Sequence, residues 1–496
     1  MIAQLGPGLA KAWQPATTAV LRCYVVTACV MALAFGILLP VEPYVAVAWL
    51  LTILVALAGP LWVVAAIVGI TVLVPFQVQD MFSVVGGRGS HSLLIVDALL
   101  LVGLLRVGWC VVRGRLRMDL PLLFGVGLAG ICAVQFFWGV RHGADVSTAG
   151  YETRRAVLGV GTFVIAWPLV NEEPARRQLA RLLVAMGLVL GLWGLAQWLF
   201  SAGFSQVGDF GVRISHVHSS PQLQGGMFAY PVAVALAWAA LISGQVRRPA
   251  VKWLLATVLF LNVVCIVLTF ERTTWLATGI ACLFVSAKSG ARGRLLAFRW
   301  IGIGLGVMAA AAVLKPGAAH TALVRLMSAD KLAVDKSVLY RIYESHAAAQ
   351  AIAARPFTGG GFGATLTWGV KGRVTTATTP FVHNGYFWLA LKVGIPVAAI
   401  IVLVVIIAVL RRCPREDSVE WRTLRTGSQA SVLTVLITLV TFAPFNSAFT
   451  AAIGLMVAIC YSRTIPADAV NTGLGASAWL AEDVTEPRSS REDGCS

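Results

Sequence analysis

The feature that most constrains this chain is the recurrence of apolar runs long enough to cross a lipid bilayer. Runs of roughly 17 to 25 residues repeat along the sequence, which is the length that a spanning helix needs. Lipid offers backbone amides no partner, so such runs must form helices. A membrane β-barrel would need ten-residue segments of alternating polarity, and the sequence has none. The predicted fold class is therefore all-α: a polytopic membrane protein.

Composition supports this class and argues against a nucleic-acid-binding protein. Hydrophobic residues make up 58% of the 496 residues and charged residues only 12%, against about a quarter in soluble domains. The net charge of +17 comes mostly from short gaps between apolar runs, where basic residues set membrane topology. We therefore expect membrane lipids, and no nucleic acid, as partners. The nine cysteines include no CxxC pair, so neither a disulfide framework nor a zinc site is predicted.

We predict 12–14 transmembrane helices arranged around one large external loop. The organisation is a cytoplasmic segment 1–18, helices within 19–314, the loop 315–384, helices within 385–462, and a disordered cytoplasmic tail 463–496. The spans lie near 20–39, 43–58, 60–75, 92–112, 120–139, 155–170, 178–200, 222–243, 251–270, 273–287, 296–314, 385–410, 428–445 and 447–462.

Five basic gaps set the predicted orientation, because all of them fall on one side of these spans. Short loops rich in arginine and lysine stay in the cytoplasm, so the 315–384 loop faces outward. The gaps hold Arg113, Arg115 and Arg117; Arg176, Arg177 and Arg181; Arg247, Arg248 and Lys252; Lys288, Arg292, Arg294 and Arg299; and Arg411, Arg412, Arg415, Arg422 and Arg425.

All seven histidines fall in predicted external loops or at their edges, whereas the equally polar cytoplasmic gaps hold none. Loops collect polar residues in any case, which explains the pattern equally well. We nevertheless expect the chemistry on the outer side. The histidines are His91, His142, His216, His218, His320, His346 and His383.

The long loop contains a predicted helix followed by a glycine-rich turn. Residues 337–354 place alanine-rich apolar positions beside a polar stripe with Arg341 and Glu344, and Pro356 ends the helix. This helix can lie at the membrane surface. Four glycines then occur within residues 359–363. They permit close backbone approach, so the amides of Gly360 and Gly361 are candidates for binding an anion; a flexible turn is the alternative.

His383 and Asn384 stand at the predicted start of the next span. The positive end of a helix disfavours imidazolium, and a neutral imidazole can act as a general base. We therefore take His383 as a candidate catalytic residue and Asn384 as a candidate substrate-binding residue. The alternative is that Asn384 caps the helix and His383 is an interfacial polar residue.

Arg272 lies in the segment TFERTTW, between two apolar runs with almost no loop. Charges at such a depth are costly and usually functional or paired. Arg272 is therefore either neutralised by Glu271 or a fixed cation for bidentate phosphate binding.

These segments carry a family resemblance. ERTTW at 271–275, the helix with Arg341, ARPFTGGGFG at 354–363 and HNGYFWLALKVGIP at 383–396 surround the loop in this order. Over roughly residues 180–445 the chain resembles the O-antigen ligase and polymerase superfamily of bacterial membrane glycosyltransferases. In that family the first motif is commonly Ser-Arg, where this chain has Glu271-Arg272.

The resemblance implies a GT-C-like helical enzyme in the bacterial cytoplasmic membrane. Such an enzyme transfers or polymerises a glycan from a polyprenyl-diphosphate-linked donor on the outer face, to a glycan, lipid or protein acceptor. It implies that Arg272 and Arg341 hold the diphosphate and that His383 activates the acceptor hydroxyl. It further implies inversion at the anomeric carbon by direct displacement, with no metal and no other cofactor.

Two other classes of protein compete with this interpretation. A transporter or flippase of lipid-linked sugars would also be polytopic, but transporters often show internal repeats and charges near the midplane. We find no convincing repeat, and most charges lie at span ends. A metal-dependent enzyme using His216, His218 and Asp209 would rest on two histidines in one loop, which is a weak pattern.

The predicted topology can be measured with reporter fusions. Fusions after Arg117, Arg181, Arg248 and Arg294 are expected to report cytoplasm, because these positions lie in basic gaps. Fusions near Gly208 and Thr375 are expected to report the exterior. A cytoplasmic signal at Thr375 would contradict the proposed chemistry, since the lipid-linked donor is presented outside.

Overall fold

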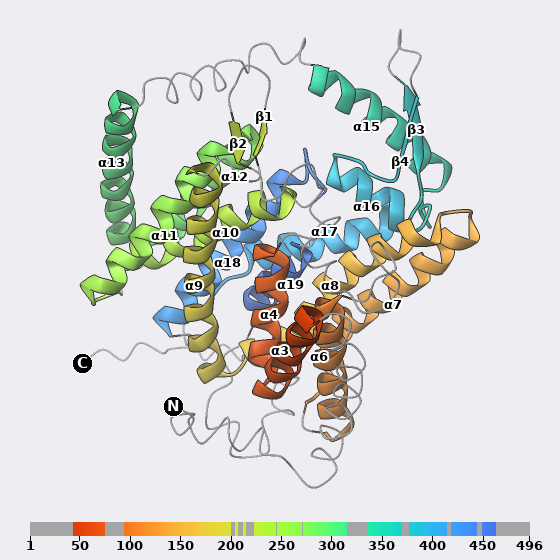
Figure 1. Ribbon diagram of the computed structural model, residues 1–496, viewed down its shortest axis with the longest axis horizontal. Helices are drawn as coiled ribbons and strands as arrows, with labels where there is room; N and C mark the ends of the chain where they lie inside the picture. Colours follow the sequence, from red (N-terminus) through yellow and green to blue (C-terminus); the bar gives the residue numbers. More distant parts are fainter. Residues whose placement is uncertain are drawn as a thin grey trace, which may run out of the picture.

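The structure, a computed structural model, is built from helices and two short β-hairpins (Figure 1). It describes residues 43–74, 94–114, 116–199, 204–206, 212–214, 223–244, 246–269, 271–314, 336–369, 376–413, 418–443 and 449–462. The helices are α3 Pro43–Ala58, α4 Pro60–Leu73, α6 Ile95–Val112, α7 Leu120–Arg141, α8 Val146–Val170, α9 Glu173–Leu199, α10 Leu223–Ile242, α11 Pro249–Leu268, α12 Arg272–Lys288, α13 Ala291–Leu314, α15 Lys336–Ala354, α16 Gly385–Val393, α17 Ile395–Leu410, α18 Val419–Thr438 and α19 Thr450–Tyr461. Antiparallel strands β1 Phe204–Gln206 and β2 Val212–Ile214 form one hairpin, and β3 Leu366–Gly369 and β4 Thr376–Thr379 the other.

The described helices confirm the predicted class, an all-α polytopic membrane protein. Five are long and apolar enough to cross a membrane, within α6, α7, α8, α9 and α11, and five shorter apolar helices accompany them. Each predicted span from 43–58 onward coincides with one or two helices. The first predicted span, 20–39, lies outside the described residues, as do 1–18 and 463–496, so the number of spans stays a prediction.

Polar side chains cap several of these apolar helices at their starts. Asp119 Oδ1 accepts the N–H of Leu122 at 3.2 Å at the start of α7, and Asp145 Oδ2 accepts the N–H of Thr148 at 2.8 Å at the start of α8. Such caps satisfy amides that a helix start leaves without an intrahelical partner. Helix α8 therefore begins at Val146, nine residues before the predicted span 155–170.

The helices pack in two groups, which α18 joins because it contacts both α10 and α19. Helix α10 contacts α11, α12 and α18, whereas α8 contacts α7 and α19. The α8–α19 contact includes a hydrogen bond from the Thr450 hydroxyl to the carbonyl of Arg155, at 2.6 Å. Helix α13 stands at one edge of the bundle (Figure 1).

Basic residues from separate gaps gather at one end of the bundle, which we call the basic end. The Arg176 guanidinium lies 4.7 Å from the ring centroid of Trp421, which joins the start of α9 to α18. Lys288 Nζ, at the end of α12, donates to Gln429 Oε1 of α18 at 2.8 Å. Three of the predicted cytoplasmic gaps thus share one end of the molecule, as the sequence predicts.

Helix α15, hairpin β3–β4 and α16 gather at the opposite end, which we call the loop end (Figure 1). Helix α15 spans Lys336–Ala354, so the predicted helix 337–354 is confirmed. The β3–β4 hairpin that follows it was not predicted from the sequence. The rings of Tyr340 and Trp368 lie edge to face at 4.1 Å and hold this hairpin against α15.

The predicted span 385–410 is wrong as a single helix, because it is broken into α16 and α17 at Gly394. Gly394 has φ 80°, a conformation that other residues rarely adopt. The N–H of Ile395 donates to the carbonyl of Pro356 at 2.7 Å instead of to the preceding helical turn. The loop after α15 thus occupies the break, and α16 becomes a separate nine-residue helix at the loop end.

Candidate functional site

The imidazole of His383 lies against the carboxylate of Glu344 on α15. Its Nδ1 is 2.9 Å from Oε2 and 3.2 Å from Oε1, and the backbone N–H of His383 donates to Oε2 at 2.9 Å. The side chain of Glu344 is 2% exposed and that of His383 is 32% exposed. A buried carboxylate thus orients a solvent-accessible imidazole, as expected for a general base held by a third group.

Asn384 lies next to this pair and caps α16. Its Oδ1 accepts the N–H groups of Tyr386 and Phe387 at 3.0 and 3.1 Å. The capping alternative considered from the sequence is therefore the role that the structure gives Asn384. The N–H of Gly385 donates to the carbonyl of Leu439 at 2.7 Å, which fixes the start of α16 beside the end of α18.

Arg341 lies one helical turn before Glu344 on α15, so the two side chains share a face. Its guanidinium carbon is 5.7 Å from the ring centroid of Phe442, four residues beyond α18. The ring of Phe442 also meets that of Phe228, near the start of α10, at 6.0 Å. Arg341 therefore lies where the loop ends of α10, α15 and α18 meet.

Arg272 is the first residue of α12, at the loop end. The indole N–H of Trp275 donates to the carbonyl of Ile266 in α11 at 2.7 Å, which fixes the start of α12 against the end of α11. Helix α12 packs against α10 and α18. The three predicted residues Arg272, Arg341 and His383 thus come from elements that all contact α18 or the segment 439–443 after it.

The glycine-rich turn after α15 packs against α7 and the end of α16. The N–H groups of Gly360 and Gly361 donate to the carbonyls of Leu391 and Lys392 at 2.7 and 3.1 Å. A Cβ on Gly361 would lie 2.3 Å from the backbone nitrogen of Gly139 in α7, so no larger residue fits there. The amides that the sequence offered to an anion are engaged in the fold, and this turn has a packing role.

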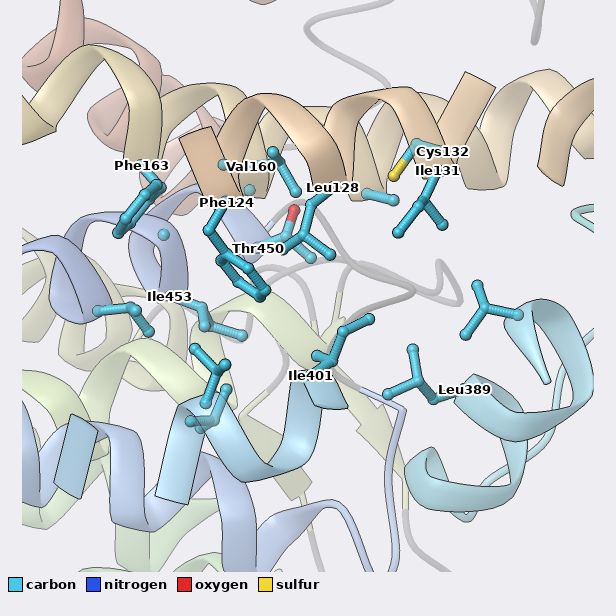
Figure 2. Close-up of a pocket in the computed structure, with 18 of the residues that line it drawn as sticks. Phe124, Leu128, Ile131, Cys132, Val160, Phe163, Leu389, Ile401, Thr450 and Ile453 are labelled. Atoms are coloured by element: carbon cyan, nitrogen blue, oxygen red, sulfur yellow. The ribbon is translucent and has the colours of Figure 1, made fainter. Parts of the chain in front are cut away.

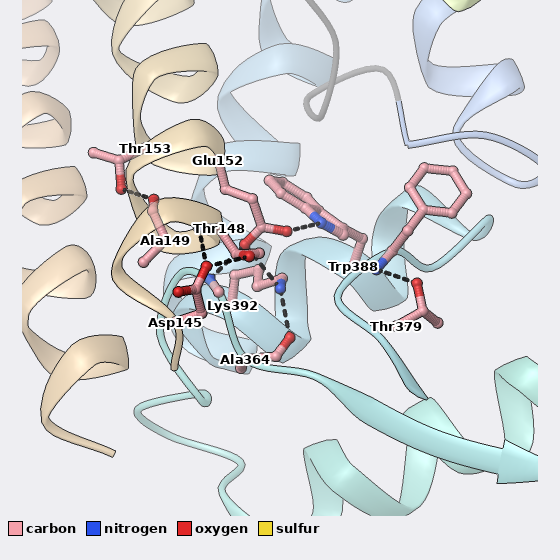
Figure 3. A network of polar contacts seen from close by, with 11 residues as sticks. Asp145, Thr148, Ala149, Glu152, Thr153, Ala364, Thr379, Trp388 and Lys392 are labelled. Atoms are coloured by element: carbon pink, nitrogen blue, oxygen red, sulfur yellow. Dashed lines mark hydrogen bonds and ion pairs between the residues drawn. The ribbon is translucent and has the colours of Figure 1, made fainter. Parts of the chain in front are cut away.

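A buried ion pair between Glu152 of α8 and Lys392 of α16 lies beside this turn (Figure 3). Lys392 Nζ is 2.9 Å from Glu152 Oε2, and the two side chains are 0% and 1% exposed. The N–H of Gly363 donates to the same carboxylate oxygen at 2.6 Å, and Lys392 donates to the carbonyl of Ala364 at 2.7 Å. These bonds help to compensate the cost of burying both charges and join α8, α16 and the turn.

An apolar cavity of about 420 Å³ lies between α7, α8, α17 and α19 (Figure 2). It extends from Leu120 and Tyr461, near the basic end, to Phe362 and Leu389 at the loop end. Its walls carry almost no polar atoms, so it suits a hydrocarbon chain and not a sugar or a diphosphate. None of Arg272, Arg341 and His383 lines it, so the polar site at the loop end is distinct from this cavity.

The described residues include three of the seven histidines. His142 follows α7 and its Nδ1 is 2.8 Å from the carbonyl of Trp138, whereas His346 is exposed on α15. His383 is the histidine among these three that a carboxylate holds. The other histidines and the alternative metal site lie outside the described residues: His91, Asp209, His216, His218 and His320.

Sequence reasoning missed three charged residues of this region. It named Glu344 only as part of a polar stripe, and it did not single out Glu152 or Lys392. Lys392 carried a usable signal, because a lysine inside an apolar span needs a partner or a function. Glu152 and Glu344 carried no such signal, since the neighbouring sequence does not show which distant residue a carboxylate contacts.

Comparison with known proteins identifies a family for the part of the chain that contains the candidate site. Residues 255–402 match the family model described as O-antigen ligase, and no curated protein matches the chain. The matched segment runs from α11 to α17 and contains Arg272, Arg341 and His383. The predicted resemblance to the O-antigen ligase superfamily is confirmed there. Together with the apolar helices, the match indicates a multi-pass membrane protein with a glycan-processing function on lipid-linked glycans.

The buried ion pair predicts an asymmetric response to substitution. Lys392→Met is expected to lower the free energy of unfolding by about 3–5 kcal/mol, because it leaves the Glu152 carboxylate buried without its cation. Adding Glu152→Gln to Lys392→Met is expected to restore part of this loss. Thermal unfolding of the purified protein in detergent measures both changes.

The exposed ion pair between Arg177 and Glu173 provides the control. Its nitrogen and oxygen atoms are 2.5 Å apart, and its side chains are 61% and 63% exposed. Arg177→Ala is expected to cost less than about 1 kcal/mol. Equal losses for Arg177→Ala and Lys392→Met would show that the buried pair does not stabilise the loop end.

Proposed function

We propose, from the O-antigen ligase match at residues 255–402, that this chain is a glycosyltransferase of the bacterial cytoplasmic membrane. It transfers or polymerises a glycan carried on a polyprenyl diphosphate, at the outer face of that membrane. The observation that carries the proposal is the imidazole of His383, held by a buried carboxylate at the loop end beside Arg341. A base, two cations and lipid-facing helices are what this reaction needs.

In the proposed reaction His383 takes the proton of the acceptor hydroxyl. The resulting nucleophilic oxygen attacks the anomeric carbon of the donor sugar, and the bond from that carbon to the diphosphate breaks. Attack from the face opposite the leaving group inverts the configuration at the anomeric carbon. The polyprenyl diphosphate leaves with the electron pair of the broken bond.

Arg272 and Arg341 bind the diphosphate in this proposal. Guanidinium groups present parallel N–H donors that match phosphate oxygens, and their charge offsets the charge that develops on the leaving group. Both residues lie at the loop end, where a polyprenyl chain in the bilayer would present its diphosphate. The amides of Gly360 and Gly361 and the side chain of Asn384 position these elements and need not contact the substrate.

The acceptor separates two versions of this function. A ligase passes the glycan to a lipid, a protein or another polymer, and a polymerase passes it to a second lipid-linked glycan. Both use the same base and the same diphosphate site, so the residues named above serve either version. Mass analysis of cell-surface glycans from a deletion strain distinguishes the two, because loss of polymerisation shortens chains whereas loss of ligation leaves them unattached.

His383→Ala is expected to reduce transfer by about 10²–10⁴-fold, because it removes the general base. The assay measures transfer from a purified lipid-linked glycan by the protein in detergent or nanodiscs. His346→Ala is the matched control, since His346 lies in the same loop region but is exposed on α15. Its activity is expected to equal that of the parent protein. Equal activity of the two variants at matched expression would show that His383 is an interfacial residue and not a base.

Arg272→Lys is expected to lose about 10- to 10²-fold in kcat/KM for the donor. An ammonium cannot reproduce the two parallel donors of a guanidinium, and a charge-assisted hydrogen bond contributes about 1.5–3 kcal/mol. Arg341→Ala is expected to raise KM for the donor more than KM for the acceptor. Arg355→Ala, an exposed arginine of the same loop, is the control. A loss confined to acceptor use would contradict the assignment of these arginines to the diphosphate.

A further inference from the structure

We infer that Glu344 is the positioning residue of the site: it holds His383 in the tautomer and orientation in which Nε2 faces the acceptor hydroxyl. This inference rests on the proposed role of His383 as the base. Neither the family match nor the residues predicted from the sequence assign a role to Glu344. It follows from the contacts between α15 and the residue before the cap of α16.

The contacts between His383 and Glu344 determine which nitrogen of the neutral imidazole carries the hydrogen. A carboxylate oxygen only accepts hydrogen bonds, so Nδ1, at 2.9 Å from Oε2, must carry a hydrogen and donate it. A neutral imidazole has a single N–H, and its other nitrogen then carries the free lone pair. Nε2 is therefore the basic nitrogen.

A second set of contacts fixes the direction of the ring. The backbone N–H of His383 donates to the carboxylate that holds Nδ1, so Glu344 restrains the main chain and the side chain together. The ring of Phe381 lies edge to face with the imidazole at 4.9 Å. The side chain of His383 keeps 32% exposure, so part of the imidazole remains accessible to a substrate hydroxyl.

Glu344 also stabilises the product of proton transfer. The imidazole becomes positive when it takes the proton of the acceptor, and the adjacent positive end of α16 opposes that charge. A carboxylate at 2.9 Å offsets this effect. Arg341, on the same face of α15, is positively charged and cannot serve in place of Glu344. This electrostatic role requires a carboxylate and not merely a hydrogen-bond acceptor.

The first test compares Glu344→Gln and Glu344→Asp with the parent protein. Glu344→Gln keeps the size and one acceptor but loses the charge, so kcat is expected to fall by about 10²-fold or more, with little change in KM for the donor. Glu344→Asp keeps the charge at shorter reach and is expected to recover part of kcat. If Glu344 has a purely structural role, the two variants lose similar amounts of kcat, and each loss follows the fall in unfolding temperature. That result would overturn the inference.

The second test asks whether Glu344 acts through His383. In a protein that already carries His383→Ala, adding Glu344→Gln is expected to cause no further loss of residual activity, because residues of one unit are not additive. Full activity of His383→Ala alone would refute the proposed function. Strong loss in His383→Ala with parental kcat in Glu344→Gln would refute only the inference about Glu344.

A third variant tests the same contact if Glu344→Gln does not fold. Replacing His383 with Nδ1-methylhistidine keeps Nε2 but removes the hydrogen that Nδ1 donates to Glu344. Its kcat is expected to fall about as far as that of Glu344→Gln. Parental kcat in this variant would show that donation from Nδ1 is not required, and the inference would be wrong.

Discussion

The loop end of this molecule depends on the buried ion pair between Glu152 and Lys392. Removing two charges from water is costly, so the pair persists only because backbone groups of the glycine-rich turn complete its hydrogen bonds. The indole of Trp388, on α16, adds a contact to Glu152 at 3.4 Å. One interaction thus fixes a spanning helix, a loop and the short helix that His383 and its cap residue precede.

The bilayer explains why the polar site and the apolar cavity occupy different parts of the same bundle. Charged groups are costly in hydrocarbon, and the residues with proposed catalytic and diphosphate-binding roles, His383, Arg272 and Arg341, all lie at the loop end of the bundle. Between the helix ends only apolar side chains are inexpensive, and a gap there becomes a cavity with hydrocarbon character. A lipid-linked substrate has the same division, with an apolar chain and a polar head, so the architecture matches its chemistry.

Local sequence signals predicted the elements that depend on local physics. The apolar runs predicted the spanning helices, Pro356 predicted the end of α15, and the capping alternative for Asn384 follows from its place before an apolar run. The contacts of the site were not predictable in this way. Glu344 meets His383 across 39 residues and Glu152 meets Lys392 across 240, and periodicity carries no information on pairs so distant. The glycine amides illustrate the same limit, because the partners that engage them lie in α16.

Helix α15 links the two halves of the proposed site. Arg341 and Glu344 are three residues apart and so lie on one face of the helix. With the roles proposed above, one residue contacts the donor diphosphate and the other orients the base for the acceptor. A rotation of α15 would displace both at once, since a helix turns as a unit. The contacts of α15 with hairpin β3–β4 and α16 therefore keep donor binding and proton transfer in one geometry.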